Sequence, residues 1–148
     1  MKMTTKILSA LLACLMLVSM TVISVSAEGT QENPINANDK WFGYGVDCYL
    51  LNPTFAEGDT DGMWYELTVE QEGILYLEHK YKDVDYTITL TTENGLAYEG
   101  GCVDGVINNG PIMTLPVQVG DVATVQIVTK DAAAGTVYAN MNIAAGTA

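Results

Sequence analysis

The sequence predicts an all-β domain, an antiparallel β-sandwich or jelly roll of about eight strands, preceded by a signal peptide. Three observations predict this architecture. Beyond residue 41, apolar side chains recur at every second position, as they do in strands that bury one face. Turn-forming clusters of Gly, Asn and Asp interrupt the alternation at short intervals. After residue 27, no window of about ten residues carries the apolar stripe of an amphipathic helix.

Residues 1–27 have the pattern of a secretory signal peptide. Two lysines precede an uncharged apolar run from Ile7 to Val25, and the small residues required by signal peptidase end at Ala27. We therefore expect cleavage after Ala27 and a secreted protein, extracellular or at the cell surface. Two alternatives stay open. The apolar run is long enough for an uncleaved membrane anchor, and the residues around Cys14 resemble a lipoprotein signal.

A single domain is expected after the signal peptide. Residues 28–40 are polar and rich in turn formers, which predicts a linker or a loose first strand, and residues 41–148 form the sandwich domain. Two of the six lysines precede residue 28, so four lysines remain against 18 acids, a formal charge of −14. This field repels phosphate backbones and anionic lipids, so we expect neither nucleic-acid binding nor membrane binding by the mature domain.

Each strand is predicted by its alternation and bounded by a turn. The alternation is most regular in residues 63–70 (MWYELTVE) and 86–91 (YTITLT), and Asn94-Gly95 is typical of the turns. The expected strands are, in order, 41–51, 63–70, 74–81, 85–92, 96–103, 112–119, 122–130 and 136–144. The expected core residues are Leu50, Tyr65, Leu67, Leu75, Leu77, Ile88, Leu90, Leu115, Val117, Val125, Ile127 and Ile143.

Two cysteines, Cys48 and Cys102, remain after the signal peptide. An even number of cysteines in an exported chain favours a disulfide over a metal site or catalysis. The sequence therefore predicts a bridge between Cys48 and Cys102, with two buried free thiols as the alternative.

Several segments resemble bacterial pre-peptidase C-terminal domains. Residues 58–69 (GDTDGMWYELTV) resemble that family's Gly-Asp-x-Asp-x-x-Tyr-x-Phe-x-Val-like opening, and residues 72–77 (EGILYL) its Gly-x-Leu-x-Leu strand. Residues 83–90 (DVDYTITL) are similar to its Asp-x-Asp-hydrophobic strand, and residues 135–141 (GTVYANM) to its closing strand. The resemblance implies a secreted, non-catalytic jelly-roll module, of which some relatives bind calcium and others bind collagen or polysaccharide. The two cysteines are not part of the family pattern.

One acidic loop is a candidate calcium site. Glu57, Asp59 and Asp61 lie within five residues of one another, and hard oxygen ligands on a flexible turn suit Ca²⁺. The alternative is that Asp and Gly are there because they favour turns. Calcium is the only cofactor that the sequence suggests.

Aromatic residues at strand faces and strand ends are candidate ligand-binding residues. Alternation sends Trp64 to the outward face while Tyr65 turns in. An exposed aromatic ring on a β-sandwich is a platform on which a sugar ring can stack. Trp41, Tyr44 and Tyr81 fall at strand ends and are further candidates. The alternative is that Trp64 packs under a loop or on a neighbouring module.

Most catalytic arrangements are excluded by composition. After residue 27 the chain has no Ser and no Arg, and His79 is the single histidine of the sequence. His79 has neither a second histidine nor free cysteines to form a zinc set, and we expect it to be an exposed polar residue. The remaining enzyme hypothesis is a small glycoside hydrolase that uses two carboxylates.

The sequence therefore predicts a secreted, non-catalytic binding or adhesion module, with a polysaccharide or another extracellular polymer as its partner. The first alternative is a structural accessory module without a ligand, a single copy of a tandem repeat that contacts neighbouring modules. The small two-carboxylate glycosidase is the second alternative.

Overall fold

The computed structural model describes residues 28–41 and 47–145, and it confirms the predicted all-β architecture. Within these ranges the helical segments are two short 3-10 turns, η1 (Ala37–Lys40) and η2 (Lys130–Ala132). No helix in the described part of the chain is long and apolar enough to cross a membrane. The predicted signal peptide and Tyr44 lie outside the described residues.

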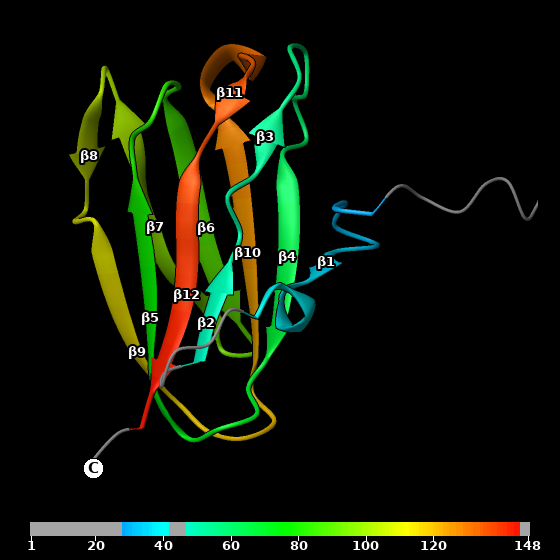
Figure 1. The fold of residues 1–148 in the computed structure, drawn as a ribbon, viewed down its shortest axis with the longest axis vertical. Helices are drawn as coiled ribbons and strands as arrows, with labels where there is room; N and C mark the ends of the chain where they lie inside the picture. The colour runs from blue at the N-terminus through cyan, green and yellow to red at the C-terminus, as the bar shows by residue number, and fades with distance from the viewer. Residues whose placement is uncertain (1–27, 42–46, 146–148) are drawn as a thin grey trace, which may run out of the picture.

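Two sheets pack face to face in a sandwich (Figure 1). In spatial order, the larger sheet comprises β1 (Ile35–Asn36), β4 (Met63–Thr68), β10 (Val122–Thr129), β6 (Tyr86–Thr92), β7 (Gly95–Val103) and β8 (Val106–Asn108). The smaller sheet comprises β2 (Asp47–Leu50), β12 (Tyr138–Ala144), β5 (Gly73–Lys80) and β9 (Ile112–Val117). A two-stranded sheet of β3 (Thr54–Phe55) and β11 (Gly135–Thr136) lies at one end.

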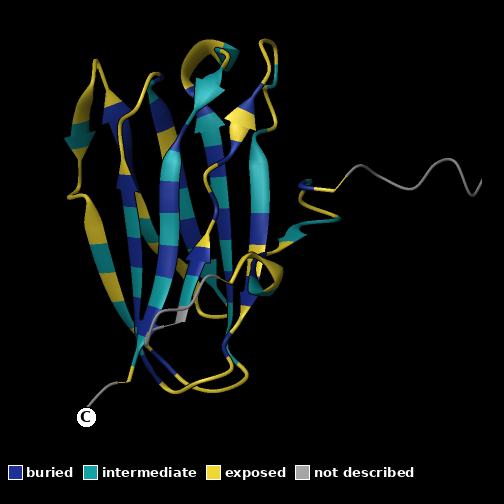
Figure 2. Ribbon diagram, in the orientation of Figure 1, coloured by how far each residue is buried: buried dark blue, intermediate teal, exposed yellow. Residues whose placement is uncertain are grey.

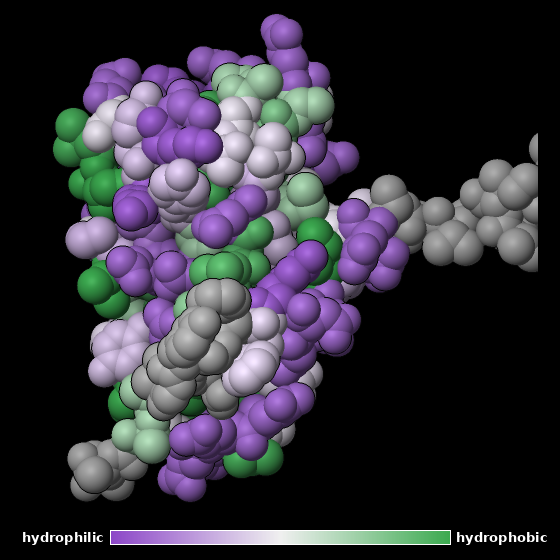
Figure 3. Space-filling model, in the orientation of Figure 1, coloured by the Kyte–Doolittle hydropathy of each residue, from purple (hydrophilic) through white to green (hydrophobic). Residues whose placement is uncertain are grey.

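The core lies between the two sheets, where the inward positions of each strand meet (Figure 2), and the surface in the same view mixes hydrophilic and hydrophobic residues (Figure 3). In β5 and β10, buried positions alternate strictly with more exposed ones, because successive side chains of a strand point to opposite faces. Ten of the predicted core residues are buried: Tyr65, Leu67, Leu75, Leu77, Ile88, Leu90, Val117, Val125, Ile127 and Ile143. Leu115 is only partly buried.

The prediction was wrong for Leu50, which is 36% exposed. In β2 it is the preceding residue, Tyr49, that faces the core. A shift of one residue exchanges the two faces of a strand, so the error follows from assigning the wrong parity to this strand. Among the described residues of the expected strand 41–51, Asp47–Leu50 form a continuous ladder.

The hairpin between β7 and β8 was not predicted. Its turn is Asp104-Gly105, with φ angles of 52° and 74°. Positive φ at both central residues is the geometry of a type I′ turn, for which Asp-Gly is a favoured pair. The hairpin adds β8 to the edge of the larger sheet beside β7.

The segment before β2 is docked on the edge of the larger sheet. β1 pairs with β4 in parallel, whereas the other strand pairs between named strands in the described residues are antiparallel. The side-chain amide of Asn38 donates to the carbonyl of Thr68 at 2.8 Å and accepts from its N–H at 2.9 Å. These bonds satisfy backbone groups of β4 that would otherwise face water at the sheet edge.

Candidate functional site

A cavity of about 350 Å³ lies against the predicted aromatic residue Trp64. Trp64 is on β4, next to the edge strand of the larger sheet, and its side chain is partly buried. It points to the outer face because its neighbours in β4 alternate, with Tyr65 buried in the core. The residues that line the cavity are Thr30, Gln31, Glu32, Thr60, Asp61, Trp64 and Gln126.

The N-terminal segment forms one wall of this cavity. The Trp64 backbone N–H donates to the Gly29 carbonyl at 2.9 Å, and the Gly29 N–H donates to Asn33 at 2.7 Å. Gly29 is buried with φ +97°, and a Cβ there would lie 2.5 Å from the Met63 sulfur. Glycine is therefore required for this turn to approach β4 closely.

The loop before β4 forms the opposite wall. The Oδ1 atom of Asp59 accepts hydrogen bonds from the N–H groups of Asp61 (3.2 Å) and Gly62 (3.1 Å). This is the arrangement of an Asx turn, in which the carboxylate organises the loop backbone. The side-chain amide of Gln126 donates to the Asp61 carbonyl at 3.2 Å and connects the loop to β10.

Several polar groups of the cavity remain available to a ligand. The Asp61 and Glu32 carboxylates and the Gln126 side-chain oxygen have no hydrogen-bond partner among the described residues. The cavity thus combines the Trp64 side chain, the Gln126 amide held by its hydrogen bond to Asp61, and two carboxylates. Aromatic surface with a few oriented polar groups is the composition of a small-molecule subsite.

The other predicted aromatic residues do not share this cavity. Trp41 is 57% exposed and follows η1, while Tyr81 is 43% exposed and lines a separate acidic hollow with Asp85 and Lys130. That hollow is larger, about 480 Å³. The Asp85 carboxylate, however, already accepts from the N–H groups of Asp104 (2.7 Å) and Gly105 (3.0 Å). These bonds lower its pKa and hold the β7–β8 turn.

The predicted calcium loop has an internal structural role. Within the described residues, no group of three or more His, Cys, Asp or Glu side chains is arranged to hold a metal ion. Glu57 is exposed, and Asp59 is engaged in its Asx turn. The calcium site at Glu57, Asp59 and Asp61 stays a prediction.

The predicted disulfide is corrected by the structure, in which Cys48 and Cys102 are free thiols. Cys48 lies on β2 in the smaller sheet and alternates with buried Tyr49, so it faces outward. Cys102 lies on β7 in the larger sheet and is buried, and its thiol donates to Asp85 Oδ1 at 3.6 Å. Burial raises the pKa of both thiols, and carboxylates nearby add to the shift.

His79 is buried, contrary to the prediction that it is exposed. It lies on β5, is 1% exposed, and both ring nitrogens are hydrogen-bonded. Nδ1 lies 2.7 Å from the hydroxyl of Tyr86, and Nε2 lies 2.7 Å from the hydroxyl of Tyr98. The two tyrosines come from β6 and β7 of the larger sheet, and His79 comes from the smaller sheet. We call His79, Tyr86 and Tyr98 the histidine cluster, which joins the two sheets.

The hydrogen bonds of Tyr98 indicate which atoms of the histidine cluster carry protons. Tyr98 has one hydroxyl proton, which it donates to the Gly110 carbonyl at 2.9 Å. Its oxygen then accepts from Nε2–H of His79, and Nδ1 accepts from the Tyr86 hydroxyl. This arrangement requires a neutral imidazole, which burial favours because it lowers the pKa of His79. Burial also raises the pKa of both tyrosines.

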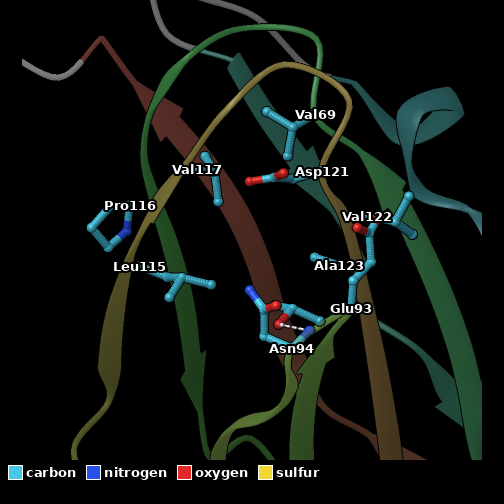
Figure 4. A pocket seen from close by; sticks show the side chains of 10 residues that line it. Val69, Glu93, Asn94, Leu115, Pro116, Val117, Asp121, Val122 and Ala123 are labelled. Carbon is cyan, nitrogen blue, oxygen red and sulfur yellow. Dashed lines mark hydrogen bonds between the residues drawn. The ribbon is translucent and has the colours of Figure 1, made fainter.

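A third hollow lies between the sheets at the end of the sandwich opposite β11 (Figure 4). Its volume is about 80 Å³, and much of its wall is apolar, including Val69, Leu115 and Val117. It is roughly a quarter of the volume of the Trp64 cavity. We therefore regard the Trp64 cavity as the better candidate for a ligand with several polar groups.

Comparison with known proteins gives no independent assignment. No protein-family model matches the chain, and no curated protein matches its sequence significantly.

Proposed function

We propose that the protein is a secreted, non-catalytic binding or adhesion module whose Trp64 cavity holds a sugar unit of an extracellular polysaccharide. The observation that carries this proposal is the position of the Trp64 indole in a cavity with Gln126, Asp61 and Glu32. The indole offers an apolar face to the C–H groups of a sugar ring. The amide and carboxylate oxygens offer acceptors for its hydroxyl groups.

The site is held on a rigid element. Trp64 and Gln126 are paired across the β4–β10 ladder, one pair from the end of its six-residue register. A site whose side chains stand on paired strands loses little entropy when the ligand binds. The predicted signal peptide and the resemblance to pre-peptidase C-terminal domains support secretion and a non-catalytic role.

The two carboxylates also bear on the glycosidase alternative. Glu32 and Asp61 line one cavity, and carboxylates in pairs carry out glycoside hydrolysis. Both side chains are exposed, however, and a general acid usually needs an environment that raises its pKa. We therefore favour binding over hydrolysis, and a search for new reducing ends in the bound polysaccharide tests this choice.

The experiment that tests the proposal is a glycan array followed by titration of the Trp64→Ala variant. Loss of the indole should weaken binding about tenfold, since aromatic contacts contribute about 1–1.5 kcal/mol. The matched control is Trp41→Ala, which removes the only other tryptophan, outside the cavity. Equal effects of the two substitutions on affinity, or the absence of any glycan ligand, would reject the proposal in favour of the structural accessory module.

A further inference from the structure

The outer face of the larger sheet beyond the Trp64 cavity carries polar side chains on β6 and in the middle of β10. Outward positions on β6 are all threonine, namely Thr87, Thr89 and Thr91, because Tyr86, Ile88 and Leu90 take the inward positions. On β10 the outward positions are Val122, Thr124, Gln126 and Val128, so two polar side chains lie between two valines. Among the described strand residues of this face, Trp64 is the only aromatic one.

The register places four of these side chains in one line across the sheet. Trp64 of β4 is paired with Gln126 of β10, Gln126 with Thr89 of β6, and Thr89 with Glu99 of β7. We call this set the Trp64–Glu99 row. Strands in a sheet lie about 4.8 Å apart, so the row extends about 14 Å from the indole. That length exceeds a single sugar ring.

The hydroxyl groups beside the row are not used by the protein. Among the described residues, the hydroxyls of Thr87, Thr89, Thr91 and Thr124 have no hydrogen-bond partner. Each hydroxyl can both donate and accept, which matches the hydroxyl groups of a sugar chain. A second line, formed by Glu66, Thr124 and Thr91, runs parallel to the row on the adjacent outward positions.

The charge of this face is negative only. Glu32 and Asp61 stand at the cavity, Glu66 flanks the row and Glu99 ends it. The four described lysines lie elsewhere: Lys40 in η1, Lys80 at the end of β5, Lys82 in the loop after β5, over the Tyr138 ring, and Lys130 in η2. A uronic-acid polymer would therefore meet like charges without a compensating cation, which disfavours its binding.

From this geometry we propose that the ligand is a linear polysaccharide without acidic groups, neutral or amino-bearing, that lies along the Trp64–Glu99 row. One sugar unit stacks on Trp64, and the following units contact Gln126 and Thr89 toward Glu99. This inference rests on the proposed function and names the class and direction of its ligand. It predicts a site for several consecutive units rather than for a single sugar.

The test uses oligomers of one to six units from cellulose, xylan, mannan, chitosan and polygalacturonic acid, titrated against the complete mature protein. We expect affinity to rise with each unit until the row is filled, at about three or four units, and then to level off. Polygalacturonate oligomers should not bind. A length-independent affinity would overturn the row while leaving a one-sugar site at Trp64 intact. Binding of polygalacturonate in preference to the other oligomers would overturn the selection by charge.

The row is tested directly by Thr89→Val, which keeps the shape and strand preference of the side chain and removes its hydroxyl. The matched control is Thr114→Val, an exposed threonine on β9 in the other sheet. Thr89→Val should weaken the binding of a four-unit oligomer about fivefold, the effect of one lost hydrogen bond. It should leave the binding of a single sugar unchanged. Equal affinities of the two variants for the four-unit oligomer would overturn the row. If no oligomer binds either variant or the parent, the proposed function itself fails.

Discussion

The histidine cluster and the Trp64 cavity both combine aromatic and polar side chains, and they differ in what those side chains contact. His79, Tyr86 and Tyr98 lie between the sheets, and their polar atoms are paired within the protein. Around Trp64, on the outer face, the Asp61 carboxylate has no partner among the described residues. A buried polar group must be satisfied internally, whereas an outward one remains available to a ligand. The contrast separates a stabilising cluster from the proposed binding site.

The largest expected effect is on stability, from His79→Ala. The substitution leaves a void and deprives two tyrosine hydroxyls of a partner, so it should cost about 3 kcal/mol in the free energy of unfolding. Trp64→Ala should cost less than about 1 kcal/mol, because its side chain is outside the core. Urea unfolding of both variants measures the difference. Similar losses would remove the distinction between the two regions.

A second prediction concerns pH. Burial lowers the pKa of His79 in the folded state, so the unfolded chain binds a proton more tightly than the native protein. Stability should therefore fall as the pH decreases through the ordinary histidine pKa of about 6.5, by at most about 1.4 kcal/mol per pH unit. Unfolding measured between pH 7.5 and about pH 5 checks this slope.

The matched control for the pH dependence is His79→Gln, which removes the only histidine of the chain. Its stability should lack the slope in this interval. Because the Trp64 cavity contains no histidine, ligand affinity should change less than stability over the same interval. A slope that persists in His79→Gln would show that other groups titrate there.

A smaller effect is expected from Asp59→Ala. The substitution removes two hydrogen bonds that hold the loop beside Trp64, and in an exposed turn this should cost about 1 kcal/mol of stability. Ligand affinity should fall with it, because Asp61 lines the cavity. If the loop also binds calcium, millimolar Ca²⁺ will raise the melting temperature of the parent but not of Asp59→Ala. Identical melting temperatures for parent and variant without calcium would contradict the turn-forming role.

The smallest expected effect concerns the cysteines. Since Cys48 and Cys102 are free, a reductant should leave the melting temperature unchanged. In the native protein, an alkylating reagent should modify Cys48, which is partly exposed, and spare Cys102, which is buried. Peptide mapping distinguishes the two sites. Protection of both thiols until reduction would reinstate the predicted disulfide.

Much of the fold follows from the period of the sequence, because alternation fixes which side of each strand enters the core. The same alternation predicts that His79 is buried, because it lies an even number of residues along β5 from the buried Leu75 and Leu77. The prediction of an exposed histidine relied on its polarity and overlooked that parity. The prediction that Leu50 is buried was wrong because β2 is short and gives too few alternations to show which of its positions face the core.

The candidate site was only partly predictable. The outward direction of Trp64 follows from the alternation of β4, but its neighbours from residues 30–32 come from a segment that docks beside β4 through parallel pairing. Local patterns carry no information about such pairing. The Cys48–Cys102 disulfide failed because Cys48 lies on the outer side of the smaller sheet, opposite in direction to buried Tyr49, whereas Cys102 is buried in the larger sheet.

The placement of the terminal strands has a mechanical consequence. β1 holds the sheet edge through two residue pairs, while β12, the last strand, lies between β2 and β5 and is paired on both sides. Tension applied at the start of the domain should peel β1 away first and open the Trp64 wall while the sandwich stays intact. Tension applied at the end of the chain loads the centre of the smaller sheet. A module anchored through its N-terminal segment would thus release any ligand bound at Trp64 under a force that leaves its fold undamaged.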